Sequence, residues 1–132
     1  MALYTKSILA PKQESDGIRI SVMSRHTKND GVTPDDRITP DLWDKWKQEL
    51  GPPLKVIGAY YKRGLPWEEF ERAYIAYLMT PDIRVQVKNL AREATQTDIT
   101  IMCIEPTPER CHRRLLAQEC QRLEPRLQVV YR

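Results

Sequence analysis

Residues able to do chemistry crowd into one short stretch near the end of the chain, in the order Cys103, Glu105, Cys111, His112 and Arg113. An ionised thiol is a nucleophile, an imidazole moves protons near neutral pH, and a guanidinium binds anions. A carboxylate can act as a base. We predict that this stretch is the functional site. The catalytic candidates are Cys111, His112 and Glu105, and the binding candidates here are Arg113 and Cys103.

A second group of polar residues follows an earlier predicted strand. Apolar and polar residues alternate from Ile18 to Val22, which is typical of a half-buried strand, and Arg25 and His26 come soon after. The run from 99 to 104 is nearly all apolar and predicts a central strand that ends at the first group. Ligands of open parallel sheets bind outside the carboxyl ends of the strands, so we expect Arg25 and His26 to join the site as binding residues.

The sequence also predicts the electrostatics of the site. A helix is expected from Pro108 to about Leu123, which places Cys111 in its first turn. The amide donors and positive dipole end of a helix attract anions and favour a thiolate. Arg110 and Arg114 add positive charge nearby.

Spacing disfavours some kinds of site. Pro106 and Pro108 remove amide donors between Cys103 and Arg110, which argues against a cysteine-phosphatase loop. Zinc takes about four ligands, whereas this stretch supplies at most three without a paired-cysteine knuckle, so we predict no metal. Cys103 and Cys111 are the one plausible redox pair, because Cys120 lies too far along the predicted helix from Cys111.

Each of these residues also has a structural interpretation. His112 can be a hydrogen-bonded residue at the edge of the core, and Cys103 a small residue inside a buried strand. Cys120 is interpreted as core. Arg25 and His26 can be ordinary loop residues. The aromatic stripe of the predicted helix from Pro66 to Leu78 is interpreted as core, not as a platform for stacking bases.

Strands and helices alternate along the rest of the chain. A strand is expected from Leu3 to Leu9, a long loop from Thr27 to Pro40, and a short helix from Pro40 to Leu50. The segment from Leu54 to Tyr61 reads as a strand or an extended connection. Further predicted elements are a helix opened by Thr80 and Pro81, with an apolar stripe from Ile83 to Ala94, and a final strand at Leu127 to Tyr131. This pattern predicts an α/β fold with a mostly parallel sheet of four to five strands flanked by helices, in two or three layers.

Length and composition set limits on the class of protein. The 132 residues favour one domain, 1–132, with a core of its own. Net charge is +3, well short of a nucleic-acid footprint by charge alone. No apolar run reaches the roughly 20 residues that span a bilayer. Three cysteines and no secretory signal favour reduced thiols and a cytoplasmic location.

The stretch from Cys103 to Ala117 resembles the signature of the domain of unknown function 488 family, which reads Cys, Glu, Pro, then Cys-His-Arg, then Leu at these spacings. A looser resemblance to the small, YeaO-like branch covers most of residues 3–131. It is carried by Asp16-Gly17 before the second strand, Arg25, and Trp67-Glu68-Glu69-Phe70 followed by Tyr74 and Leu78. That branch often lacks Cys-His-Arg, so the chain mixes features of both.

One position departs from the family pattern, since Ser24 stands where the family usually has an aspartate before the strand-end arginine. The resemblance implies an α/β fold and a pocket formed by that arginine and the Cys-His-Arg turn. The resemblance does not indicate which activity the protein has, and the cofactor is left unknown.

These observations support three hypotheses of function. The leading one is a protein that binds an anionic small molecule, such as a nucleotide or a phosphorylated metabolite, with or without catalysis. The second is a cysteine-based redox or thiol enzyme. The third is a non-enzymatic module that binds nucleic acid or protein, motivated by the 27–40 loop and the mild basicity.

Overall fold

A single five-stranded sheet organises the chain, which the computed structural model describes over residues 1–132. The strand order is β3-β2-β4-β1-β5, and every pair of neighbours is parallel. The strands are β1 (Ala2–Ser7), β2 (Ile18–Ser21), β3 (Lys45–Trp46), β4 (Ile99–Cys103) and β5 (Gln128–Tyr131). The predicted α/β fold with a parallel sheet is therefore confirmed.

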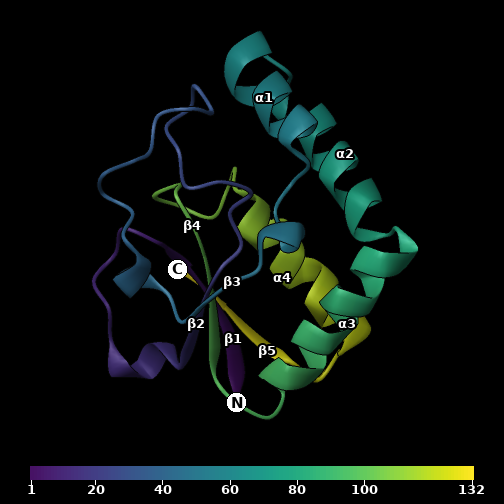
Figure 1. The fold of residues 1–132 in the computed structure, drawn as a ribbon. Coiled ribbons are helices and arrows are strands. Elements are labelled where there is room, and N and C mark those ends of the chain that lie inside the picture. The colour runs from purple at the N-terminus through teal and green to yellow at the C-terminus, as the bar shows by residue number, and fades with distance from the viewer.

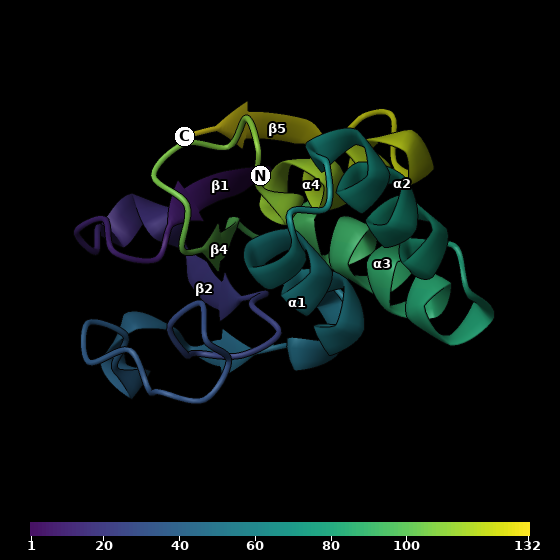
Figure 2. The same cartoon turned by 90° about the horizontal axis from the view of Figure 1, so that it is seen from above.

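Four helices lie together on one face of this sheet, as the two views in Figures 1 and 2 show. They are α1 (Leu54–Arg63), α2 (Trp67–Leu78), α3 (Pro81–Ala94) and α4 (His112–Leu123). The architecture is thus two-layered, which decides between the two arrangements that the sequence leaves open. No helix of the structure has the length and apolar character needed to cross a membrane.

The main core lies between the sheet and these helices. All five residues of β4 are buried, because β4 is the middle strand and is covered on both faces. The predicted stripe on α3 is confirmed, with Val87, Leu90, Ala91 and Ala94 fully buried and Ile83 packed at the edge. Thr80 occupies the N-cap position of α3 and Pro81 is its first residue, as the sequence predicts, although the Thr80 hydroxyl donates to the Tyr77 carbonyl instead of capping the helix.

The opposite face of the sheet is covered by loops instead of helices. A second, smaller core contains Ile8, Met23, Ile38 and Met102, together with Cys103 and Cys111. The buried ion pair between Lys6 and Asp16 also ties the connection from β1 to β2 onto the sheet. This second core contains six buried residues, whereas the main core contains 17. Loops are enough to cover the smaller core.

The predicted helix from Pro40 to Leu50 is wrong. The segment contains two short 3-10 turns, Pro40–Leu42 and Gln48–Leu50, with β3 between them. The free edge of β2 explains the difference, because its Arg19 and Ser21 carbonyls accept hydrogen bonds from the amides of Asp44 and Lys47. Pairing with an edge strand overrides the helical spacing of the apolar residues.

The segment from Leu54 to Tyr61 is neither a strand nor an extended connection, because it belongs to α1. Its aromatic residues pack against α2, where the Tyr60 ring lies 4.9 Å from Phe70 and 5.9 Å from Trp67. Gly64 ends the helix in the left-handed region, at φ 68°, which glycine adopts without strain. The neighbouring helix therefore decides the structure of a segment whose β-branched and aromatic residues suggest a strand.

The last helix begins later than Pro108, the position that the sequence predicts. Cys111 is its extended N-cap residue, and α4 starts at His112. Two arginines of the first turn explain this, since Arg113 donates to the carbonyl of Glu105 and Arg114 to that of Glu109. These bonds hold the preceding loop in an irregular conformation.

The hydroxyl of Tyr74 ties α2 to the segment that follows β3. Tyr74 is fully buried and donates to the Leu50 carbonyl at 2.5 Å. We expect Tyr74→Phe to lower the free energy of unfolding by about 1–3 kcal/mol, because it leaves a buried carbonyl without its donor. Urea denaturation measures the loss.

Tyr77→Phe is the matched control for this prediction. The Tyr77 hydroxyl donates to the Glu49 carbonyl at 2.6 Å in an exposed position, where water can replace it. Its removal should change stability by less than about 0.5 kcal/mol. Equal losses in the two variants would contradict the assigned role of Tyr74.

Candidate active site

A narrow cavity of about 40 Å³ lies beyond the carboxyl ends of β2 and β4 and beneath α1. Five of the predicted site residues line it, namely Arg25, Cys103, Glu105, Cys111 and His112. The two polar groups that lie some 80 positions apart in the sequence thus meet at the carboxyl ends of the strands. These strand ends lie below α1 in Figure 1. Arg113 and His26 do not line the cavity.

His112 is held in one orientation by both of its ring nitrogens. Nε2 lies 2.7 Å from the carbonyl oxygen of Val22, and Nδ1 lies 3.5 Å from Sγ of Cys103. Because a carbonyl oxygen can only accept, Nε2 carries the proton and Nδ1 presents its lone pair to the thiol. Burial lowers the pKa of His112 to about 4, so the ring is neutral at pH 7.

Cys103 and Cys111 bring two thiols to the same point. Their sulfur atoms and Nδ1 of His112 all lie within 4.8 Å of one another. Burial raises the pKa of Cys103 well above its ordinary value, and the neighbouring Cys111 adds to the rise. Burial also acts to raise the pKa of Cys111, but the adjacent Cys103 and the positive charge of Arg113 outweigh it and lower that pKa. The first proton that the pair loses therefore leaves a thiolate at Cys111.

Arg113 lies beneath the thiols with no exposed surface. Its terminal nitrogens donate to the carbonyls of Glu105 at 2.8 Å and Arg132 at 3.5 Å, while Nε has no partner. The guanidinium forms no ion pair with the side chain of an aspartate or glutamate. Since an uncompensated buried charge is costly, a thiolate at Cys111 is the counter-charge that this position favours.

Glu105 is held by a residue from the helical layer. The Tyr61 hydroxyl donates to its carboxylate at 2.5 Å. Burial and this carboxylate raise the pKa of Tyr61 well above its ordinary value, so Tyr61 stays a donor. The pair joins α1 to the loop between β4 and α4.

Sequence reasoning missed the wall of the cavity that α1 and α2 provide. Tyr60, Tyr61, Trp67 and Phe70 line it, although the sequence assigns the last two to the core. The helical spacing of Trp67 and Phe70 shows only that these two residues share a buried face. The pair Tyr60-Tyr61 lies in a segment that the sequence analysis leaves open as a strand or an extended connection. A helix assignment there would have brought these two aromatic residues to the site.

Arg25 enters the cavity from the loop after β2. It makes no hydrogen bond or ion pair with another residue, and its buried Nη2 has no acceptor. Gly31 leaves space for it, since a Cβ there would lie 2.4 Å from Nη1. The guanidinium is therefore available to a ligand.

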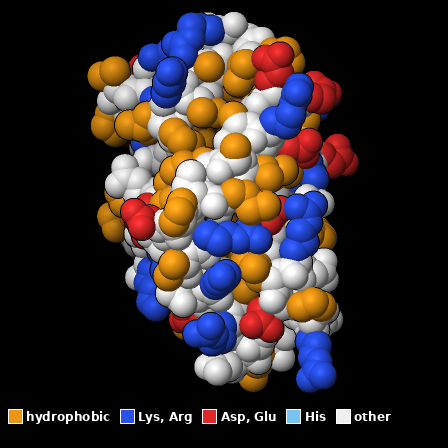
Figure 3. All heavy atoms as spheres, turned by 90° about the vertical axis from the view of Figure 1, so that its right-hand side faces the viewer, with side chains coloured by type: hydrophobic (Ala, Val, Ile, Leu, Met, Phe, Trp, Pro, Cys, Tyr) orange, Lys and Arg blue, Asp and Glu red, His pale blue; other side chains and the backbone are white.

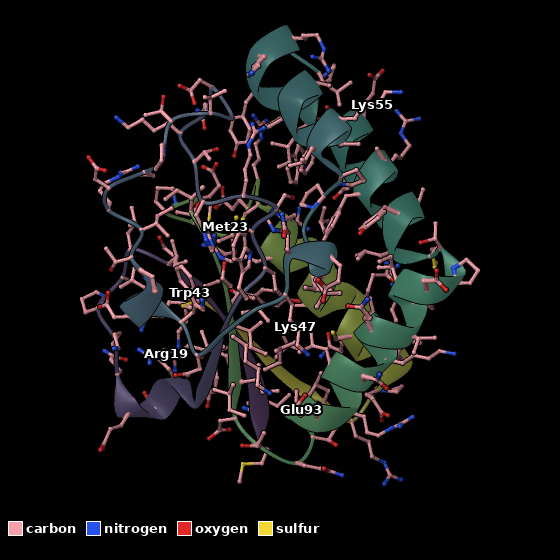
Figure 4. The ribbon with its side chains drawn as sticks, in the orientation of Figure 1. Arg19, Met23, Trp43, Lys47, Lys55 and Glu93 are labelled. Atoms are coloured by element: carbon pink, nitrogen blue, oxygen red, sulfur yellow. The ribbon has the colours of Figure 1, made fainter.

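Ser24 and Gly51 hold the start of this loop in place. The Ser24 hydroxyl donates to the carbonyl of Pro52. An ionised aspartate, which the family usually has at this position, could not donate there. A Cβ on Gly51 would lie 2.6 Å from the amide nitrogen of Ser24, so only glycine permits this close approach. Met23, labelled in Figure 4, lies beside these residues and lines the cavity.

His26 points to a different environment. Its ring lies 4.3 Å from that of Trp43 and 4.0 Å from that of Trp46, and its Nε2 lies 2.7 Å from the Ser21 hydroxyl. Trp43 is labelled in Figure 4 on the side of the sheet away from the helices. Burial lowers the pKa of His26 to about 4. A binding role for His26 stays a prediction that this position does not favour.

The thiol pair and His112 present the atoms that zinc accepts. Three such atoms meet here, and the bond from Nε2 to a backbone carbonyl is typical of a histidine that holds a metal. Structural zinc takes a fourth ligand, however, and the buried cation of Arg113 beside the thiols opposes a second cation. The predicted absence of a metal stays a prediction.

Comparison with protein families gives a match over residues 3–122, to a model described as the active DUF488-N3 subclade. The matched range includes the strand-end arginine and the whole Cys-His-Arg turn. No curated protein and no solved structure matches the chain.

The neutral, buried state of His112 predicts a pH-dependent stability. Between pH 6.5 and about 4 the unfolded chain binds a proton at this ring that the folded chain does not, so stability falls as the pH falls through this range. We expect this ring to lower the free energy of unfolding by about 2 kcal/mol at pH 5 relative to pH 7.

Urea denaturation of three proteins at both pH values tests this expectation. His112→Asn should lose the part of the pH dependence that this ring contributes. His26→Asn should keep that part and lose only the separate contribution of His26, whose pKa burial also lowers to about 4. The chain has two histidines, so the pair of variants accounts for both. An unchanged pH dependence in His112→Asn would show that the ring is not neutralised by burial.

Proposed function

The chain belongs to the DUF488 family, and we propose that it binds an anionic small molecule in this cavity, where the thiolate of Cys111 acts as a nucleophile. A nucleotide or a phosphorylated metabolite is the class of ligand that we favour. The observation that carries the proposal is the shared cavity, in which the partnerless Arg25 and the thiol of Cys111 both lie.

The charge of Arg25 supports the anionic ligand. A guanidinium with a buried nitrogen and no acceptor loses hydration without compensation, so a ligand oxygen that accepts from it is favoured. Phosphates and carboxylates match its planar fork. Lys28 and Arg110 also line the opening and are exposed, which extends the positive charge outward.

The size of the cavity limits which part of the ligand reaches the thiols. A volume of 40 Å³ has room for about three water molecules. A terminal group of that size fits inside, and the remainder of a larger ligand lies outside against the exposed basic residues. The aromatic side chains of Tyr60, Trp67 and Phe70 provide an apolar wall for that group.

The chemistry follows from the protonation of the thiol pair. The Cys111 thiolate attacks an electrophilic atom of the ligand, a sulfur–ligand bond forms, and the leaving group departs with the electrons of the broken bond. The Tyr61–Glu105 pair lines the same cavity and can deliver a proton to that group from solvent. Water then releases the bound part of the ligand and regenerates the thiol.

Binding of nucleic acid receives less support. The net charge is +3, and the outer face of the helices in Figure 3 mixes hydrophobic, basic and acidic side chains without a continuous basic surface. A strong positive surface is the usual footprint of a nucleic-acid partner. We also propose a cytoplasmic location, because all three cysteines are free thiols, which a reducing compartment preserves.

Arg25→Gln tests the binding part of the proposal. With inorganic phosphate or a nucleoside monophosphate at ten times its dissociation constant, we expect the melting temperature of the native chain to rise by about 4 °C. The variant should lose this rise, because it lacks the charge that faces the cavity. Arg126→Gln is the control, since Arg126 is exposed before β5, at the opposite end of the sheet.

A melting temperature that no anion changes, with equal behaviour of Arg25→Gln and Arg126→Gln, would refute anion binding. An equal rise in all three proteins would show binding elsewhere on the surface.

The alkylation rate of Cys111 tests the nucleophile. The rate with iodoacetamide should reach half its maximum at a pH below about 8.5, the ordinary thiol value. Arg113→Met should move this midpoint upward, because the buried positive charge is removed. Cys120→Ser should leave the profile unchanged, since burial raises the pKa of Cys120 to about 12. A native midpoint at or above 8.5 would contradict the thiolate.

A further inference from the structure

If Cys111 alone were the nucleophile, the site would not need a second thiol, that of Cys103, beside it. Sγ of Cys103 and Sγ of Cys111 lie within 4.8 Å of each other, whereas the bonded sulfurs of a disulfide lie about 2 Å apart. Cys103 ends the central strand and is fixed by its neighbours on both sides. Cys111 follows the irregular loop 104–110, so a small movement of that loop can bring the two sulfurs together.

The two thiols also differ in the way that a reacting pair requires. The sulfur of Cys111 lies beside the guanidinium of Arg113, which stabilises negative charge there. The Cys103 thiol instead faces the lone pair of Nδ1 of His112 at 3.5 Å. Cys111 is thus placed to attack first, and Cys103 is placed to give up its proton afterwards.

The cavity admits only a small oxidant to these sulfurs. It measures about 40 Å³, and nine of its 17 lining residues are hydrophobic. A hydroperoxide group is of this size and carries no charge. Arg25, without an intramolecular partner, lies in the same cavity and can donate to the departing oxygen.

From this arrangement we infer that Cys103 and Cys111 form a redox couple that reduces small hydroperoxides and closes to a disulfide. The inference rests on the proposed function in one respect, the reactive sulfur of Cys111, and adds a reaction and a partner residue to it.

The steps balance in atoms and electrons. The Cys111 thiolate attacks the terminal oxygen of the hydroperoxide, an S–O bond forms, the O–O bond breaks, and the alkoxide takes a proton from solvent to leave as an alcohol. Cys111 is now a sulfenic acid, oxidised by two electrons. The Cys103 sulfur then attacks the Cys111 sulfur, its proton passes through Nδ1 of His112 to the departing hydroxide, and water leaves. A thiol reductant restores the pair.

Peptide mapping of the full chain under non-reducing conditions tests the inference. The reduced protein is treated with one equivalent of hydrogen peroxide, and the peptides are identified by mass spectrometry. We expect a linked peptide pair that contains Cys103 and Cys111 and that dithiothreitol separates. Cys120 should stay reduced and react at least roughly 10-fold more slowly, because its thiol is buried in α4 away from the cavity.

Variants at the three cysteine positions separate the roles of these residues. Cys103→Ser should accumulate a sulfenic acid at Cys111, which dimedone traps, and Cys103→Ala provides the same test if serine disturbs the core. Cys111→Ser should form neither the sulfenic acid nor the disulfide. Cys120→Ser should behave as the native chain does.

Three outcomes would overturn the inference. The first is peroxide oxidation that spreads equally over the three cysteines. The second is a sulfinic acid at Cys111 without a disulfide in the native chain. The third is zinc bound at one equivalent that blocks oxidation until a chelator removes it, which would make these residues a metal site. In the second outcome the proposed function survives, because Cys111 would still be a reactive thiolate. Slow alkylation of Cys111 together with rapid disulfide formation would refute the proposed function instead.

Discussion

Arg113 carries a full positive charge into a position with no exposed surface, and no carboxylate side chain pairs with it. Its acceptors are the backbone oxygens of Glu105, in the loop after β4, and of Arg132, after β5. The charge therefore fixes the path of that loop and delays the start of α4 to His112. It also makes Cys111 the more acidic of two adjacent thiols. A neutral residue of equal volume at position 113 would remove both the charge that favours the Cys111 thiolate and the hydrogen bond that holds the loop after β4.

The site also depends on the segment that follows β2. The carbonyl of Val22 fixes the tautomer of His112, and the indole of Trp46 donates to the next carbonyl, that of Met23. Gly51 packs closely against the backbone of Val22 and Ser24. This short stretch therefore sets the orientation of an imidazole from α4 and carries Arg25 into the cavity. The backbone of this segment therefore aligns His112 with Arg25, which come from the two halves of the chain. Backbone atoms are the same in every sequence, so no sequence motif reveals this alignment.

The limits of prediction from sequence follow from this. The buried strand at β4, the cap of α3 and the convergence of Arg25 with the Cys-His-Arg turn follow from local patterns, because periodicity and parallel topology determine them. The assignments at 40–50 and 54–61 fail because partners decide these segments: the open edge of β2 for the first and α2 for the second. The cavity wall was missed for the same reason, since Tyr60 and Tyr61 depend on the correct assignment of α1. The buried state of Arg113 was also not foreseen, because its type and spacing equally suit a surface residue that binds anions.

The position of β1 within the sheet has a consequence for how the molecule assembles. β1 is the first strand of the chain, yet it lies between β4 and β5, with Leu3 opposite Ile99 and Ala2 opposite Gln128. Both of its neighbours follow it at a large distance along the chain, so β1 is synthesised well before either of its partners. Contacts so distant in sequence form slowly, because a long loop must close before they contribute. The sheet is therefore completed only after β5 has been synthesised, and until then the edges of β1 are open to pairing with other chains.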